Sequence, residues 1–172
     1  MSDNSEPRRI IVTWEEYFEL FRKLIRDINA SGFKLRQVVC IARGGLLPGE
    51  IISRTLGDLP LAVVCARSYG ETETEPGQFV FGRHLASAEG ILPVDTLIVD
   101  ELDQSGRTLK LTIEWFRRRY KIPRDKIRTA VVWHKKCSLF VPNFYGQLIV
   151  PDVDTGKYPW IDTPQELFYK TL

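Results

Sequence analysis

The chain has 172 residues, 44% of them hydrophobic, and we expect residues 1–172 to form a single compact α/β domain. Lys and Arg number 24 and Asp and Glu number 22, so the net charge of +2 argues against a surface built to hold nucleic acid, and we expect no nucleic-acid partner. The first ten residues, MSDNSEPRRI, lack an apolar signal core, and no apolar run is long enough to cross a bilayer, so we expect a soluble cytoplasmic protein with no membrane partner.

The first predicted element is a helix over residues 14–30, where apolar side chains recur on one helical face. Thr13 is followed three residues later by Glu16, the pattern of a capping box. Val12 is placed to pack on Tyr17 as a hydrophobic staple. These signals place the beginning of the helix immediately after Thr13.

Short apolar runs then alternate with helical segments. The predicted strands are residues 38–42, 61–66, 96–99 and 127–133, and the predicted helices between them are residues 48–56 and 107–120. Strands that are apolar on both faces indicate a central, mostly parallel sheet flanked by helices. Ligands of such sheets bind beyond the carboxyl ends of the strands, so we expect the functional residues in those loops.

Two stretches lack a clear period. Residues 70–90 are polar, and they form either a mobile lid or an inserted hairpin in which residues 78–81 are one strand. Residues 137–172 are rich in proline and aromatic side chains, and we expect them to form a loop-rich cap. The basic run 117–119 is interpreted as a solvated helical face, with contact to a partner subunit or to RNA as the alternative.

The most informative segment runs from Leu97 to Thr108. A buried strand ends in Asp100 and Glu101, and a turn of small residues then opens a helix. Amides and hydroxyls at a helix N-terminus form a pocket for a dianion, and the adjacent carboxylates suit two sugar hydroxyls or a magnesium ion. If only part of this pattern were present, the two acids would be read as helix caps, but the whole run is present.

On these residues the sequence resembles the type I phosphoribosyltransferases, whose signature is an apolar strand, two acids and a small-Gly-x-Thr turn. The resemblance extends in order to residues 42–49, to Ser68-Tyr69, to Lys135 and to Trp160-Ile161, and covers most of residues 37–164. Bacterial xanthine-guanine and hypoxanthine phosphoribosyltransferases are the branch it resembles. It implies the type I fold, with a mobile loop over residues 70–90 and a small C-terminal hood over residues 137–172.

The resemblance also implies a role for each matching residue toward 5-phosphoribosyl-1-pyrophosphate (PRPP). Asp100 and Glu101 would contact the ribose hydroxyls and help to hold Mg²⁺, directly or through water. The 5-phosphate would be bound by the turn made of Gln104, Ser105, Gly106, Arg107 and Thr108. Pyrophosphate would be held by Arg43 and Gly44, in a loop that often contains a cis peptide in the family, and Ser68 and Tyr69 would begin the mobile loop.

Recognition of the nucleobase rests on three residues. Lys135 resembles the family lysine that donates to a purine 6-oxo group, although a solvated lysine is the alternative because Lys136 follows it. Trp160 resembles the aromatic residue that stacks on the base, and Ile161 offers its carbonyl, although a buried core tryptophan is the alternative.

One departure from the family concerns the general base. Gln104 stands where hypoxanthine-type enzymes have an aspartate, and an amide does not accept that proton. The adjacent Asp103 is the candidate replacement, so the expected catalytic residues are Asp100, Glu101 and Asp103. His84 and His134 have no companion at metal-ligand spacing, so we expect no transition-metal site.

The resemblance therefore implies Mg²⁺-dependent phosphoribosyl transfer from PRPP to a 6-oxopurine, a purine-salvage reaction. The implied partners are PRPP, a nucleobase and further copies of the chain in a dimer or tetramer. The alternatives are a regulator that binds PRPP or a nucleotide with little turnover, and an enzyme for another nucleobase.

Overall fold

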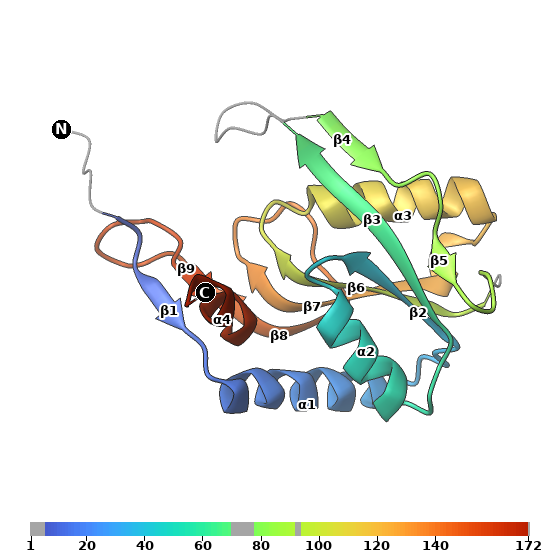
Figure 1. Cartoon of the computed structure of the whole chain (residues 1–172), viewed down its shortest axis with the longest axis horizontal. Coiled ribbons are helices and arrows are strands. Elements are labelled where there is room, and N and C mark those ends of the chain that lie inside the picture. Colours follow the sequence, from blue (N-terminus) through green and yellow to red (C-terminus); the bar gives the residue numbers. More distant parts are fainter. Residues whose placement is uncertain (1–5, 70–77, 92–93, 172) are drawn as a thin grey trace.

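The structure is a computed structural model that describes residues 6–69, 78–91 and 94–171 (Figure 1). Within these ranges, no helix combines the length and apolar character needed to span a membrane. The strands are β1 (Arg9–Ile11), β2 (Gln37–Ala42), β3 (Leu61–Tyr69), β4 (Gln78–Phe81), β5 (Ala86–Ser87), β6 (Thr96–Asp103), β7 (Ile127–Lys135), β8 (Phe144–Ile149) and β9 (Trp160–Asp162). The helices are α1 (Trp14–Ala30), α2 (Leu46–Thr55), α3 (Arg107–Tyr120), the short 3-10 helix η1 (Arg124–Lys126) and α4 (Pro164–Lys170).

The central sheet has the order β4-β3-β2-β6-β7-β8, with β5 also paired to β3. The pairs from β3 through β8 are parallel, and β4 and β5 add antiparallel partners at the β3 edge. This arrangement confirms the predicted mostly parallel α/β sheet. Since β2 and β6 are neighbours, the loops that follow them meet at one edge of the sheet.

The core lies on both faces of this sheet. Along β2, Val38 and Cys40 pack with the cluster that contains α1 and α2, whereas Val39 and Ile41 pack with the cluster that contains α3. Alternate residues of a strand point to opposite faces of the sheet, and all four side chains are buried because helices cover both faces. Figure 1 shows α1 and α2 on one side of the sheet and α3 on the other.

Helix α1 begins where its sequence predicts. Thr13 Oγ1 accepts from the Glu16 amide at 3.2 Å, and the Glu16 carboxylate accepts from the Thr13 amide at 2.8 Å, which completes the capping box. Val12 and Tyr17 are buried in the same core cluster, consistent with the predicted staple.

The C-terminal segment differs from the expected loop-rich cap. Residues 144–149 form β8, which pairs parallel with β7, so this part of residues 137–172 belongs to the central sheet. The expectation missed β8 because apolar and polar residues do not alternate along Phe144–Ile149. The remaining hood contains β9 and α4, and it recruits β1 from the other end of the chain.

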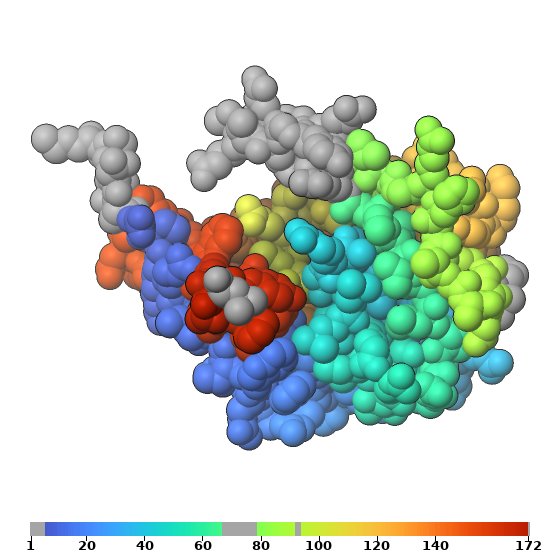
Figure 2. All heavy atoms as spheres, viewed as in Figure 1, coloured from blue at the N-terminus to red at the C-terminus, as the bar shows by residue number. Residues whose placement is uncertain are grey.

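The hood is tied together by one buried carboxylate. Asp162 has a side chain that is 1% exposed, and it accepts from Arg9 Nε at 2.7 Å and from Lys170 Nζ at 2.5 Å. The hydrogen bond from Arg9, followed by the one from Lys170, lowers the pKa of Asp162. In Figure 2 the blue β1 and the orange to red C-terminal segments form one continuous region of the surface.

The long polar stretch resolves partly into strands. Residues 78–81 form β4 and pair with the end of β3, as the hairpin alternative proposes. Residues 86–87 form β5, so a mobile loop over all of residues 70–90 is too broad an expectation. Residues 70–77 lie outside the described part of the chain.

A close contact between α2 and β2 fixes the helix that follows the first loop. A Cβ placed on Gly49 would lie 2.2 Å from the Sγ atom of the buried Cys40. We predict that Gly49→Ala lowers the free energy of unfolding by about 1–3 kcal/mol, because the extra methyl overpacks this contact. Urea denaturation measures the change.

Cys40→Ala serves as the matched partner in a double-mutant cycle. The Cys40→Ala/Gly49→Ala protein should be more stable than the sum of the two single changes predicts, by on the order of 1 kcal/mol, because the new methyl occupies the space of the removed sulfur. Additive changes would contradict the contact.

Candidate functional site

The loop after β2 packs directly against the acid pair at the end of β6. A Cβ on Gly44 would lie 2.9 Å from Glu101 Cβ and 3.4 Å from Asp100 Oδ1. A Cβ on Gly45 would lie 2.3 Å from the Val99 carbonyl oxygen. Only glycine permits this approach of two backbones, so the loop expected to hold pyrophosphate and the acids expected to hold ribose are adjacent.

The same loop carries an exposed cation and an unusual peptide bond. Arg43 is exposed at the carboxyl end of β2. The Ala42–Arg43 peptide is cis, as in the loop of the family that the sequence resembles. Gly44 therefore lies beside the acids, and Arg43 precedes it in the same loop.

Asp100 is half-buried at the carboxyl end of β6, where its Oδ1 atom accepts from the Glu101 amide at 2.8 Å. Burial raises the pKa of Asp100 to about 7, and the neighbouring charges of Glu101 and Asp103 act in the same direction. A cation or sugar hydroxyls placed here would favour its ionised form.

Glu101 has two side-chain donors already in place. Its Oε1 atom accepts from the Tyr17 hydroxyl at 2.7 Å and from Gln165 Nε2 at 2.6 Å. Burial raises the pKa of Glu101, while both hydrogen bonds lower it. Because Tyr17 belongs to α1 and Gln165 to α4, this carboxylate joins the sheet, the first helix and the hood.

The expected phosphate turn has the required backbone. Gly106 has φ +79°, and a Cβ there would lie 2.4 Å from Phe140 Cβ and 2.7 Å from the Phe140 amide nitrogen. Helix α3 begins at Arg107, whose amide donates to Ser105 Oγ at 3.4 Å, with Thr108 in its first turn. The turn thus places a helix N-terminus beside the acid pair, a favourable position for an anion.

A cavity of about 180 Å³ lies between the sheet and the hood. It is lined by Glu101, Leu102, Gln104, Trp133, Lys135, Pro159, Trp160, Ile161, Thr163 and Glu166. The expected base residues Lys135, Trp160 and Ile161 therefore line one cavity. Glu101, one of the two acids of the pair, lines the same cavity.

Lys135 is a buried cation in this cavity. Its side chain belongs to a residue that is 8% exposed, and its Nζ atom donates to Gln104 Oε1 at 3.3 Å. Burial lowers the pKa of Lys135. Trp160 is 55% exposed, which excludes the buried-core alternative and leaves a ring face free to stack on a planar ligand.

Asp103 does not occupy the expected position. It is 3% exposed, and its Oδ2 atom lies 2.8 Å from His134 Nδ1. It is absent from the lining of the cavity that holds Gln104 and Lys135. The structure therefore argues against Asp103 as the replacement proton acceptor, because successive residues of a strand end point in different directions.

Ser68 and Tyr69 form the end of β3, which is longer than the predicted strand 61–66. Their backbone partners are Phe79 and Gln78 of β4. The loop that they would begin falls on residues 70–77, outside the described residues.

Sequence analysis missed several residues of the site. Tyr17 lies on the apolar face of the predicted helix, and the spacing of apolar residues does not indicate that its hydroxyl reaches Glu101. Gln165 donates to Glu101 and Glu166 lines the cavity, and the sequence pattern singles out neither of them. The signal for Gln165 and Glu166 was their position just after Pro164 in the predicted hood.

The raised pKa of Asp100 predicts a dependence of stability on pH. Because the value near 7 lies above the ordinary value of 3.8, the folded protein binds this proton more tightly, and the associated stability is present below pH 4 and lost as the pH rises through 7. Asp100→Asn should therefore gain stability relative to the parent between pH 4 and pH 8, by on the order of 1–4 kcal/mol.

Denaturant unfolding of both proteins at several pH values measures this gain. Asp58→Asn, which removes an exposed carboxylate, controls for the change in net charge. A stability difference between parent and Asp100→Asn that stays constant with pH would contradict the expected titration.

Comparison with known proteins agrees with this geometry. The model of the phosphoribosyl transferase domain matches residues 10–154. A xanthine-guanine phosphoribosyltransferase from Idiomarina loihiensis is 31% identical over 163 residues, covering 93% of this chain and 88% of that protein. Two solved structures have a TM-score of 0.71: a purine phosphoribosyltransferase from Pyrococcus horikoshii, 25% identical and covering 92% of this chain and 93% of that one, and the xanthine-guanine-hypoxanthine phosphoribosyltransferase of Helicobacter pylori, 18% identical and covering 95% and 97%. With the loops, the acid pair and the turn arranged as described, the chain belongs to the phosphoribosyltransferase family of enzymes and has its type I fold.

Proposed function

We propose that the protein transfers the 5-phosphoribosyl group of PRPP to a 6-oxopurine and releases pyrophosphate. The observation that carries this proposal is the buried Lys135 ammonium in a cavity rimmed by the exposed Trp160 ring and bounded by Glu101. A fixed cation selects a base with an acceptor at position 6 over adenine, which has a donor there. Two of the relatives described above are named for xanthine and guanine, which is consistent with this choice.

In the proposed reaction the protein acts mainly by positioning and by electrostatics. The amides at the start of α3 would hold the 5-phosphate, Asp100 would accept from the ribose hydroxyls, and Arg43 with Gly44 would hold the departing pyrophosphate. The bond from the anomeric carbon to pyrophosphate breaks, a bond from that carbon to a purine nitrogen forms, and the proton that the base loses passes to water or to the departing pyrophosphate.

Magnesium would enter with PRPP. Among the described residues, no group of three potential ligands could hold a metal ion without the substrate. Asp100 fits such an ion best, since its oxygens are hard ligands and a cation would offset its burial, whereas Glu101 is engaged by Tyr17 and Gln165. The ion supplies charge neutralisation for the pyrophosphate.

A second function is favoured by a specific observation, the neutral side chain of Gln104 beside Lys135 in the cavity. Gln104 is neutral and accepts from Lys135, and Asp103 is turned toward His134. A protein with this arrangement would bind PRPP or a nucleotide with little turnover and act as a regulator.

The proposed transferase is also a homo-oligomer, a dimer or tetramer, which light scattering of the purified protein tests.

The first test is pyrophosphate release from PRPP and Mg²⁺ with each nucleobase separately. We predict release with guanine, xanthine or hypoxanthine and none with adenine, uracil or orotate. Lys135→Gln should lower kcat/KM about 10–100-fold, because a hydrogen bond from a charged donor contributes about 1.5–3 kcal/mol. Lys136→Gln, at the adjacent exposed lysine, should leave kcat/KM unchanged. An equal loss in both variants would sink the role of Lys135.

The second test restores a carboxylate at the base. Gln104→Asp should raise kcat about tenfold or more if proton removal limits the parent protein, since a positioned base typically contributes 10²–10⁴-fold. Tight PRPP binding by calorimetry without pyrophosphate release in the parent would establish the regulator instead. Unchanged kcat in an active parent would mean that another group accepts the proton.

A further inference from the structure

The positive charge of the chain is concentrated in one short segment. Residues 117–128 contain a single acid, Asp125, and carry a net charge of +6, while the whole chain carries +2, so the remaining residues carry −4. The near-neutral composition therefore conceals a strongly basic surface. Its cations are Arg117, Arg118, Arg119, Lys121, Arg124, Lys126 and Arg128.

This basic segment lies away from the candidate active site. It includes the end of α3, then η1 and the beginning of β7, at the amino ends of the parallel strands. The acid pair and the phosphate turn lie at the carboxyl ends of those strands. PRPP in its proposed position would therefore leave this surface free.

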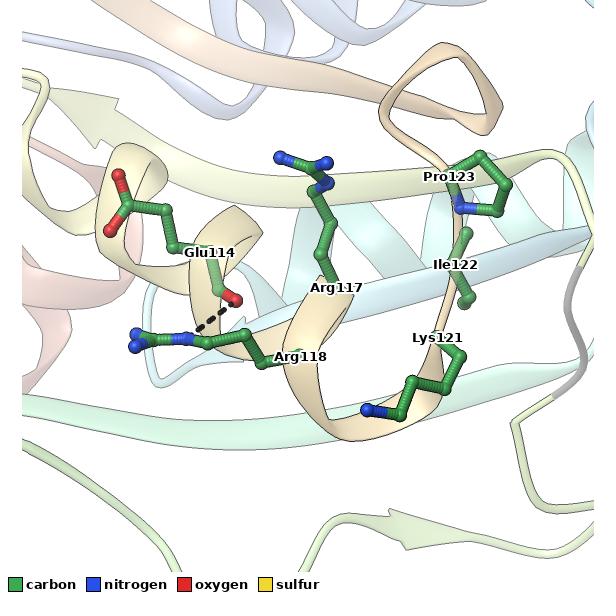
Figure 3. A pocket seen from close by; sticks show the side chains of 6 residues that line it. All are labelled: Glu114, Arg117, Arg118, Lys121, Ile122 and Pro123. Atoms are coloured by element: carbon green, nitrogen blue, oxygen red, sulfur yellow. Dashed lines mark hydrogen bonds between the residues drawn. The ribbon is translucent and has the colours of Figure 1, made fainter.

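An open groove of about 530 Å³ runs along the segment. Its lining residues are Glu114, Arg117, Arg118, Lys121, Ile122 and Pro123. Figure 3 shows Arg117, Arg118 and Lys121 extending from the end of α3, with Ile122 and Pro123 in the segment that leaves the helix. Three cations thus stand beside an apolar floor, and Glu114 is the one acid in the lining.

Several of these cations have no counter-ion. Arg118 Nε donates to the Glu114 carbonyl at 3.3 Å, and Lys126 lies 3.3 Å from Asp95. In the part of the chain that the structure describes, the side chains of Arg117 and Lys121 have no hydrogen-bond or ion-pair partner. These side chains are available to form ion pairs with an anionic ligand.

The helix dipole accounts for only part of this charge. Cations in the last turn of α3 interact favourably with its C-terminus. Arg124 and Arg128 follow the helix, and Arg124 is crowded enough that burial, then the charges of Arg128 and Arg117, lower its pKa. An anion bound among these cations would reduce the repulsion between them.

We propose that this groove binds the phosphate backbone of single-stranded RNA. The cations extend over a long, open surface rather than enclosing one point, which suits a chain of phosphates better than a single small anion. Two aromatic rings near these cations are already in contact with other side chains: Phe33 lies 4.8 Å beneath the guanidinium of Arg128, and Tyr120 packs against Trp115 and Phe116. Binding would therefore rest on the phosphates, which predicts little preference among the bases.

The test uses the full chain and a fluorescent oligouridylate of about twelve nucleotides, measured by anisotropy over a range of salt concentrations. We predict saturable binding whose affinity falls as salt rises. Arg117→Gln combined with Lys121→Gln should weaken binding about tenfold and reduce the slope of log Kd against log salt by about 1.4, since each phosphate contact on a single strand contributes about 0.7.

Arg22→Gln combined with Arg26→Gln is the matched control, because it removes two exposed cations from α1 and changes the net charge equally. Its RNA affinity should remain within twofold of the parent. Absence of saturable binding, or an equal loss in both double variants, would overturn the proposal. Competition by inorganic tripolyphosphate as effective as by unlabelled RNA would also overturn it, in favour of a small-anion site. Pyrophosphate release by the same variants is measured in parallel, so that RNA binding and the proposed transferase function are judged separately.

Discussion

The candidate site depends on one carboxylate, that of Glu101, more than on any other group. Its Oε1 atom accepts from Tyr17 of α1 and from Gln165 of α4. Its Cβ atom lies so close to Gly44 that no side chain fits at that position. Three parts of the chain that are far apart in sequence therefore meet at a single charged group. Because each donor lowers the energy of the ionised form, the hood position and the charge of the acid pair are linked.

The neighbouring acids consequently have different properties. Glu101 accepts from two donors outside its strand, while Asp100 accepts, among the described residues, only from the adjacent amide and has a pKa of about 7. An acid whose ionised form is disfavoured by burial is expected where a cation or a diol binds, since the ligand stabilises the negative charge. The same division explains why Asp100, rather than Glu101, is the better candidate for contact with PRPP and its metal ion.

The sequence was sufficient to predict those features that depend on local period and on backbone chemistry. The helix 14–30 and its capping box follow from the spacing of residues along the chain. The turn at Gly106 follows from a positive φ angle that favours glycine. It was insufficient where a side chain acts at long range. The apolar spacing that includes Tyr17 is the same whether or not its hydroxyl bonds Glu101. The direction of the Asp103 side chain depends on the pairing of β6 with β7, which places His134 opposite it. Strand β8 was missed because pairing with β7, not its own pattern, makes it a strand.

Charge shows the same contrast between local and global information. A net charge of +2 describes no part of this molecule well, because the segment 117–128 is strongly basic and the remainder is acidic on balance. Electrostatic attraction falls off over about 8–10 Å at ordinary salt, so a ligand at the end of α3 responds to Arg117 and Lys121 and hardly at all to acids elsewhere. The two anion sites proposed for this fold, at opposite ends of the parallel strands, can therefore differ in kind: one would use amides at a helix N-terminus for a single phosphate, and the other would use exposed cations for a chain of phosphates.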